Sequence, residues 1–238
     1  MKTLFCFPSS GSAASMYQSW KVLLAQQNIE LVALEYPARG TRFCDSPVDS
    51  IAELTHDLIN QIKPKLAHTT EFAFLGHSLG GLVCFETTRL LSKLKLPLPS
   101  QLIISARQGP LCNLPSSLSS KQTDSEIIKT LKTMGGIADE VLAHAELMAL
   151  MLPIIRADLK LNEEYSCSDT SAISIPITAI YGSHDPVVEK KNVEQWHSFT
   201  ESEFELIEMS GDHFYFNQDL PLFLATLAQQ LYNKMPVI

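Results

Sequence analysis

The sequence predicts an α/β fold, in which a mostly parallel central sheet has helices on both faces. Short β-rich runs alternate with longer amphipathic runs, the pattern of parallel strands joined by helical crossovers. No internal repeat and no Gly/Ser-rich linker divides the chain. Of the 238 residues, 45% are hydrophobic and 18% charged, which is ordinary for a globular protein with a sizeable core. We therefore expect residues 1–238 to form a single domain.

The β-rich runs give the order of the expected elements. The expected strands are residues 3–7, 29–36, 71–76, 101–106, 176–182 and 204–211, and helical patterns lie between most of them. Residues 118–161 break the alternation, because they hold several helical segments and no strand. We expect this stretch to be an inserted helical lid. Its apolar residues, such as Leu152 and Ile155, either pack against the body of the protein or line an apolar channel.

Composition limits the partners and the compartment. The net charge of −8 argues against nucleic acid, and no apolar run reaches the roughly 20 residues that cross a bilayer. The apolar run at the N-terminus is too short for a signal peptide, and five cysteines without paired spacing suggest neither disulfides nor a zinc site. We expect a cytoplasmic monomer without membrane contact, metal or cofactor. An acidic partner would need a local basic patch, for which the candidates are Lys63, Lys65, Arg89, Lys93 and Lys95; scattered, solvated lysines are the alternative.

The stretch FAFLGHSLGG, residues 72–81, carries the strongest chemical signal. A β-run leads into Gly76-His77-Ser78-Leu79-Gly80, and a helical pattern follows. Strand, tight turn and helix are the context of a G-x-S-x-G nucleophile elbow, in which the serine stands at the tip of the turn. The two glycines remove β-carbons where the strand and helix backbones crowd each other. We therefore predict that Ser78 is a nucleophile.

A serine nucleophile needs a base, and the base needs an acid that orients it. In this context the chain order is serine, acid, histidine. Asp185 follows the run 176–182 and His213 follows the run 204–211, so both are expected at the sheet edge that carries Ser78. We interpret His77 as an elbow residue and His184 as a neighbour of the acid. The other histidines fall in helical or helix-flanking segments.

The negative oxygen of a tetrahedral intermediate needs N–H donors. One is expected from the backbone of Leu79, which follows the nucleophile. The second is expected from the loop FPSSGSAAS after the first strand, where Ser10 is the preferred donor and Ser9 the alternative.

Motifs along nearly the whole chain make it resemble a known family. They are Phe7-Pro8 through Tyr17, EYPARGTR, GHSLGG, SARQGP, Gly135-Gly136, Glu146-Leu147, Pro153 to Asp158, YGSHDP and GDHFYF. The chain is similar to the stand-alone type II thioesterases of nonribosomal peptide and polyketide synthases, which belong to the α/β-hydrolase superfamily. It departs from the family where Ser10-Gly11-Ser12 replaces Ala-Gly-Gly and where Ala38 replaces a glycine.

The resemblance implies hydrolysis of acyl or aminoacyl groups from the phosphopantetheine arm of an acyl- or peptidyl-carrier protein. Such an enzyme clears stalled or misprimed synthases. One alternative is an esterase or lipase that acts on small free esters with the same triad, and another is a binding module that has lost catalysis. Arg39 and Arg42 could contact the carrier or the pantetheine phosphate, or they could form structural ion pairs.

Overall fold

The computed structural model describes residues 1–67, 69–113, 115–137 and 139–233. Each of the six β-rich runs overlaps a strand, so the predicted element order is confirmed. The strands are β1 (Lys2–Phe7), β2 (Ile29–Ala33), β3 (Phe72–His77), β4 (Leu102–Ser105), β5 (Ile177–Gly182) and β6 (Phe204–Met209).

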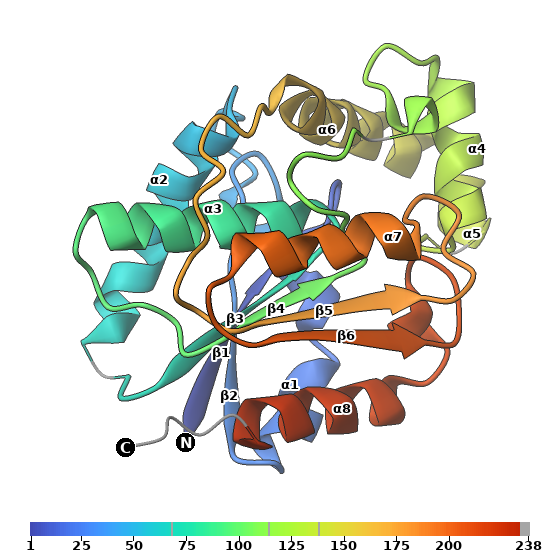
Figure 1. The fold of residues 1–238 in the computed structure, drawn as a ribbon. Helices are drawn as coiled ribbons and strands as arrows, with labels where there is room; N and C mark the ends of the chain where they lie inside the picture. Colours follow the sequence, from blue (N-terminus) through green and yellow to red (C-terminus); the bar gives the residue numbers. More distant parts are fainter. Residues whose placement is uncertain (68, 114, 138, 234–238) are drawn as a thin grey trace.

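The strands form a six-stranded sheet in the order β2-β1-β3-β4-β5-β6, and every neighbouring pair is parallel. Their carboxyl ends therefore lie at one edge, to which the arrowheads point in Figure 1. The register pairs Phe7 of β1 with Gly76 of β3, and His77 with Ser105 of β4. Residues that follow β1, β3 and β4 consequently begin side by side, which is where ligands bind in open parallel sheets.

Helices cover both faces of the sheet (Figure 1). On one face lie α2 (Ile51–Leu66), α3 (Leu79–Lys93) and α7 (Lys190–Val193), which continues into the 3-10 helix η4 (Glu194–Phe199); on the other lie α1 (Trp20–Ala25) and α8 (Leu220–Asn233). Successive strand side chains point to opposite faces, and both Leu4 and Phe5 of β1 are buried, as a doubly covered parallel sheet requires. Phe5 packs with the cluster that includes Trp196, and Leu4 with the cluster that includes Trp20.

Between β4 and β5 the described residues contain helices and no strand. These elements, called the helical insertion below, are the 3-10 helix η3 (Ser116–Leu118), α4 (Asp124–Met134), α5 (Asp139–Leu142) and α6 (Ala145–Glu164). They occupy the stretch expected at about 118–161 and extend a few residues beyond it at both ends; Ala138 lies outside the described residues. Figure 1 shows the insertion over the carboxyl edge of the sheet. The role of the insertion as a lid and the single-domain organisation of residues 1–238 remain predictions.

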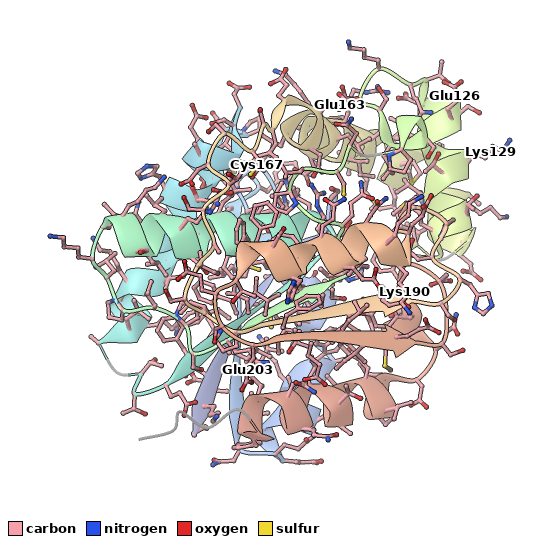
Figure 2. All side chains as sticks on the ribbon, viewed as in Figure 1. Glu126, Lys129, Glu163, Cys167, Lys190 and Glu203 are labelled. Carbon is pink, nitrogen blue, oxygen red and sulfur yellow. The ribbon has the colours of Figure 1, made fainter. Side chains whose placement is uncertain are left out.

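The insertion has a small core of its own. Ile127 of α4 packs against Met148, Leu152, Ile155 and Leu159 of α6. In Figure 2, Glu126 and Lys129 lie on the outer side of α4, and both are exposed. Helix α4 therefore packs its apolar side against α6 and presents its charged side to solvent.

Three further 3-10 helices lie in loops: η1 (Ala14–Tyr17), η2 (Gly40–Arg42) and η5 (Tyr215–Asn217). Within the described ranges, no helix is both long enough and apolar enough to span a bilayer.

Candidate active site

Ser78 lies in the sharp turn between β3 and α3, with φ 55° and ψ −115°. A β-carbon at Gly76 would lie 2.0 Å from the carbonyl oxygen of Gly80, and one at Gly80 would lie 2.1 Å from that of Phe7. Both positions therefore require glycine, as the elbow interpretation predicts. The N–H of Ser78 donates to the carbonyl of Ser105 at 2.8 Å, which ties the strained turn to the next strand.

Asp185 and His213, from the loops after β5 and β6, form a buried pair. Nδ1 of His213 lies 2.8 Å from Oδ2 of Asp185, and the two side chains are 1% and 0% exposed. The other carboxylate oxygen of Asp185 accepts the N–H groups of Val187 and Val188, at 2.9 and 3.1 Å. A carboxylate only accepts, so Nδ1 of His213 carries the proton in this bond and Nε2 of the neutral ring is left to accept one.

Nε2 of His213 is buried and has no hydrogen-bond partner within the described part of the chain. The structure thus brings Asp185 and His213 together but forms no hydrogen bond between His213 and Ser78. Phe214, the next residue, lines the cavity that Ser78 also lines. In unliganded sites the bond between nucleophile and base is often long and tightens only when substrate binds.

His77 is held in a buried network of its own. Its Nδ1 lies 2.8 Å from the Ser105 hydroxyl, which lies 2.5 Å from the Tyr215 hydroxyl. Its ring centroid is 5.2 Å from that of His213. Burial, together with repulsion from His213, keeps the pKa of His77 well below its usual value. His77 is therefore a neutral packing neighbour of His213.

Asp212 and His184, which lie next to His213 and Asp185 in the sequence, have partners of their own. Asp212 accepts the N–H of Phe214 at 2.9 Å, a local turn contact. His184 is exposed, and its Nδ1 lies 2.8 Å from the Ser183 hydroxyl.

A cavity of about 430 Å³ lies between the carboxyl edge of the sheet and the helical insertion. Ser78 and the loop of residues 9–13 line it on one side. Of the apolar residues of the insertion, Met151 and Ile155 line the cavity, as one of the two expectations has it, whereas Met148 and Leu152 pack in the insertion's own core. The apolar wall from the insertion comprises Leu118, Ile127, Leu131, Met134, Ile137, Val141, Met151, Ile155 and Leu159.

Both proposed sources of oxyanion donors lie beside this cavity. Leu79 is the first residue of α3, so its N–H has no acceptor within the helix. Ser9 and Ser10 both line the cavity in a turn closed by a bond of 3.0 Å from Ser12 N–H to the Ser9 carbonyl. The geometry leaves Ser10 and its alternative Ser9 both open.

Arg39 and Arg42 form the structural ion pairs that the sequence allowed. Arg39 binds both oxygens of Asp158, at 2.6 and 2.8 Å, and is 6% exposed. Arg42 binds Asp57 at 2.9 Å and Asp45 at 2.7 Å, and the hydrogen bond to Asp57 raises the pKa of Arg42. Both guanidinium groups are thus bound to carboxylates of this chain.

Arg89 is likewise not part of an open basic patch. It is buried, bonds Glu86 at 3.2 Å and stacks on Phe85 at 4.5 Å. Among the described residues no group of three or more His, Cys, Asp or Glu side chains is arranged to hold a metal ion.

Sequence reasoning missed Arg107 as a wall residue of the cavity. It is 5% exposed, and its Nη1 donates to Oδ1 of Asn162 at 2.7 Å. No ion pair to a carboxylate is found for it within the described ranges, and burial lowers the pKa of Arg107 to about 10. The motif SARQGP contains this arginine, but nothing in the motif indicates that its side chain is buried beside the site.

The parallel sheet, the glycine-crowded serine turn and the covered cavity define an α/β-hydrolase. The model of the family described as the thioesterase domain matches residues 2–231, so the chain belongs to the thioesterase family. One relative is the gramicidin S biosynthesis protein GrsT of Aneurinibacillus migulanus, which is 29% identical over 228 residues, covering 96% of this chain and 88% of that protein.

Solved structures agree with this assignment. RedJ, a thioesterase from the prodiginine pathway of Streptomyces coelicolor, matches with a TM-score of 0.88 at 26% identity, covering 96% of this chain and 89% of RedJ. The type II thioesterase BorB of the borrelidin cluster matches with a TM-score of 0.85 at 28% identity, covering 97% of this chain and 92% of BorB. The predicted fold and the predicted kind of enzyme, a thioesterase, are confirmed.

Proposed function

We propose that this protein hydrolyses acyl or aminoacyl thioesters on the phosphopantetheine arm of a carrier protein, with Ser78 as nucleophile, His213 as base and Asp185 as the orienting acid. Family membership and the biosynthetic pathways named for the relatives support the substrate class. The observation that carries the mechanism is the buried bond of 2.8 Å from His213 to Asp185; among the described residues, Nε2 of His213 has no hydrogen-bond partner.

In the acylation step, the Ser78 hydroxyl attacks the thioester carbonyl carbon while Nε2 of His213 takes its proton. Asp185 stabilises the imidazolium that forms and holds the ring in orientation. The carbonyl oxygen becomes negative and faces the N–H groups of Leu79 and Ser10, at the N-terminus of α3, where the helix dipole also favours negative charge. The carbon–sulfur bond then breaks, and the pantetheine thiol leaves with the proton from His213.

In the deacylation step, water attacks the acyl-Ser78 ester and His213 accepts its proton. The carboxylic acid leaves and Ser78 regains its proton. A thiol with a pKa near 8.5 leaves more readily than an amine, so thioesters place a modest demand on His213 as an acid.

The cavity supports an apolar acyl group as the moiety that is removed. Its wall from the insertion is mostly apolar, and the cavity is also lined by Ser78. A chain with a net charge of −8 attracts an acidic carrier poorly over distance, so docking depends on local contacts and recognition is broad. Broad recognition suits the editing of many misloaded carriers. The cytoplasmic location and the monomeric state remain predictions.

Labelling with a fluorophosphonate probe tests the nucleophile. We expect the wild type to be labelled at Ser78 and Ser78→Ala to be unlabelled. Ser198→Ala is the matched control, because Ser198 is exposed on η4 and its hydroxyl donates to the nearby Gln195 carbonyl. Labelling that persists after Ser78→Ala refutes the assignment.

A second measurement tests the substrate class against the esterase alternative. Values of kcat/KM are compared for an acyl-carrier thioester and for the free oxygen ester with the same acyl group. We expect the carrier thioester to be preferred. A strong preference for the free oxygen ester would overturn the proposed substrate and leave the triad in place.

A further inference from the structure

Helix α6 holds the loop of the second oxyanion donor through two of its side chains. Asp158 and Asn162 are one turn apart on α6, so they share a face of the helix. Both contact the turn Ser9–Ser12, which lies about 150 residues earlier in the chain, since the two contacts span 147 and 152 residues. The fold therefore places α6 in direct contact with the turn that holds the proposed second oxyanion donor.

Asp158 binds the backbone of this turn. The N–H of Gly11 donates to Oδ2 of Asp158 at 2.7 Å, and Arg39 binds both oxygens of the same carboxylate. Asp158 is 1% exposed. A bidentate guanidinium fixes the plane of a carboxylate, so the oxygen that receives Gly11 has little freedom. Gly11 directly follows Ser10, the proposed donor.

Asn162 binds the side chain of Ser10 itself. Arg107 can only donate, so its bond of 2.7 Å requires the oxygen of the Asn162 amide to face it. The amide nitrogen must then face the other way, where it lies 3.4 Å from the Ser10 hydroxyl and 3.1 Å from the Asp158 carbonyl. The bond from Arg107 thus fixes the orientation of the Asn162 amide, so that its nitrogen faces Ser10.

Helix α6 also packs closely against the turn Ser9–Ser12. Gly11 has φ +73°, and a β-carbon on it would lie 2.5 Å from Cγ1 of Ile155. Any movement of α6 away from the sheet would therefore break these polar contacts and open a gap at Gly11.

We propose that Asp158 and Asn162 are positioning residues for the second oxyanion donor, so that catalysis depends on the docking of α6 against the loop. Arg39 orients the side chain of Asp158, and Arg107 orients that of Asn162. The inference rests on the proposed function, because it assigns a role within the same hydrolytic site. With this role, the helical insertion not only forms a wall of the cavity but also positions a catalytic group.

The decisive variant removes the anchor without leaving a buried charge. Asp158→Leu alone leaves the buried charge of Arg39 without its carboxylate partner, and such a variant can fail to fold for that reason alone. The double variant Arg39→Met/Asp158→Leu replaces the whole ion pair with apolar side chains, which buried pairs often tolerate without loss of stability. Its melting temperature establishes that it is folded before kinetics are measured.

In the folded double variant we expect kcat for an acyl thioester to fall by about 10² to 10³, as for loss of one oxyanion donor, with KM within about threefold. Affinity for a trifluoromethyl ketone analogue, which forms the tetrahedral adduct, should fall by a similar factor. We expect Asn162→Ala to lower kcat about tenfold, a smaller loss because its bond to the loop is long. Lys160→Gln, on an exposed face of the same helix, is the control and should keep the wild-type kcat.

A folded double variant that keeps kcat and analogue affinity within threefold of the wild type overturns the proposal. A loss of kcat with unchanged analogue affinity overturns it too, because the defect then lies outside the oxyanion site. Hydrogen exchange of a peptide covering residues 8–16 distinguishes failure of this positioning proposal from failure of the proposed function. If the wild type hydrolyses no thioester, faster exchange of this peptide in the double variant still supports the positioning of the loop by α6, and unchanged exchange contradicts it.

Discussion

The carboxylate of Asp185 accepts three hydrogen bonds, one from His213 and two from backbone N–H groups of the next turn. Asp185→Asn would keep the shape of this side chain but could donate to Nδ1 of His213, which favours the tautomer whose Nε2 already carries a proton. The ring could then no longer accept the proton of Ser78. We expect kcat to fall by about 10⁴, measured with an acyl thioester at neutral pH.

Asp212→Asn provides the matched control for this prediction. Asp212 lies beside His213 in sequence, but its carboxylate accepts the N–H of Phe214. We expect kcat of this variant to stay within about tenfold of the wild type. Equal losses in both variants would mean that the loop as a whole, and not the pair of Asp185 with His213, accounts for the effect.

The buried, neutral His77 makes stability depend on pH. Its pKa is lowered in the folded protein, first by burial and second by His213, whereas the unfolded chain has an ordinary value near 6.5. Below that value the unfolded state binds a proton that the folded state does not, so stability is fully present above pH 6.5 and is lost as pH falls toward the lowered pKa.

Between pH 7.5 and 5.5 this loss should be on the order of 1 kcal/mol of the free energy of unfolding. Urea unfolding at both pH values, in the wild type and in His77→Asn, isolates the contribution of His77, because the other titrating groups are shared. We expect the variant to lose correspondingly less stability on acidification. The same pH dependence in both proteins would contradict the linkage.

The sequence reveals local chemistry at single residues better than it reveals contacts. Ser78, Asp185 and His213 could be chosen from motif context and chain order, since each follows a β-rich run. The anchors of the oxyanion loop could not be chosen, because Asp158 and Asn162 meet it only through the tertiary fold. No local pattern records a contact between segments so far apart.

At the scale of elements, the turn before Arg39 carries strain that a glycine would remove. Ala38 has φ +64°, the left-handed region that costs an L-residue about 1–2 kcal/mol. Glycine has more conformational freedom than alanine in the unfolded chain, which costs Ala38→Gly about 0.5–1 kcal/mol of stability. We therefore expect a net gain of up to about 1 kcal/mol in the free energy of unfolding. A gain of that size raises the melting temperature of a chain this long by about 2–4 °C.

Asn28 is the comparison for this prediction, because it too has positive φ, at 59°. Asparagine tolerates this region better than alanine, so Asn28→Gly should gain less than Ala38→Gly. Hydrolytic activity of Ala38→Gly should be unchanged. A lower melting temperature in Ala38→Gly would show that the alanine side chain contributes packing that outweighs the strain.

The boundaries of elements were less predictable than their existence. The run 29–36 predicts a strand to residue 36, but β2 ends at Ala33. Beyond it the chain leaves the sheet, because the N–H of Glu35 donates to Gln61 of α2 and the Glu35 carboxylate accepts the N–H groups of Ala14 and Thr41. The apolar pattern continues through this segment, but its hydrogen bonds go to loops and a helix.

At the scale of the whole molecule, parallel strands with helical crossovers followed from the alternating pattern, whereas the strand order β2-β1-β3-β4-β5-β6 did not. That order sets β1 between β2 and β3 and so brings the oxyanion loop beside the serine turn. The cavity also arises at this scale. It exists only because the insertion folds back over the sheet edge, and sequence alone left open which of its apolar residues would face inward.

The cavity leads to a prediction about acyl length. Leu131 of α4 lines it, so Leu131→Trp should shorten the space available to an acyl chain. We expect kcat/KM to fall at least tenfold for a dodecanoyl thioester and to change little for an acetyl thioester on the same carrier. Leu150→Trp is the control, because Leu150 is 59% exposed and is not among the residues that line the cavity. Equal losses for both acyl groups in Leu131→Trp would mean that the acyl chain does not enter this cavity, since only an occupied cavity can select by length.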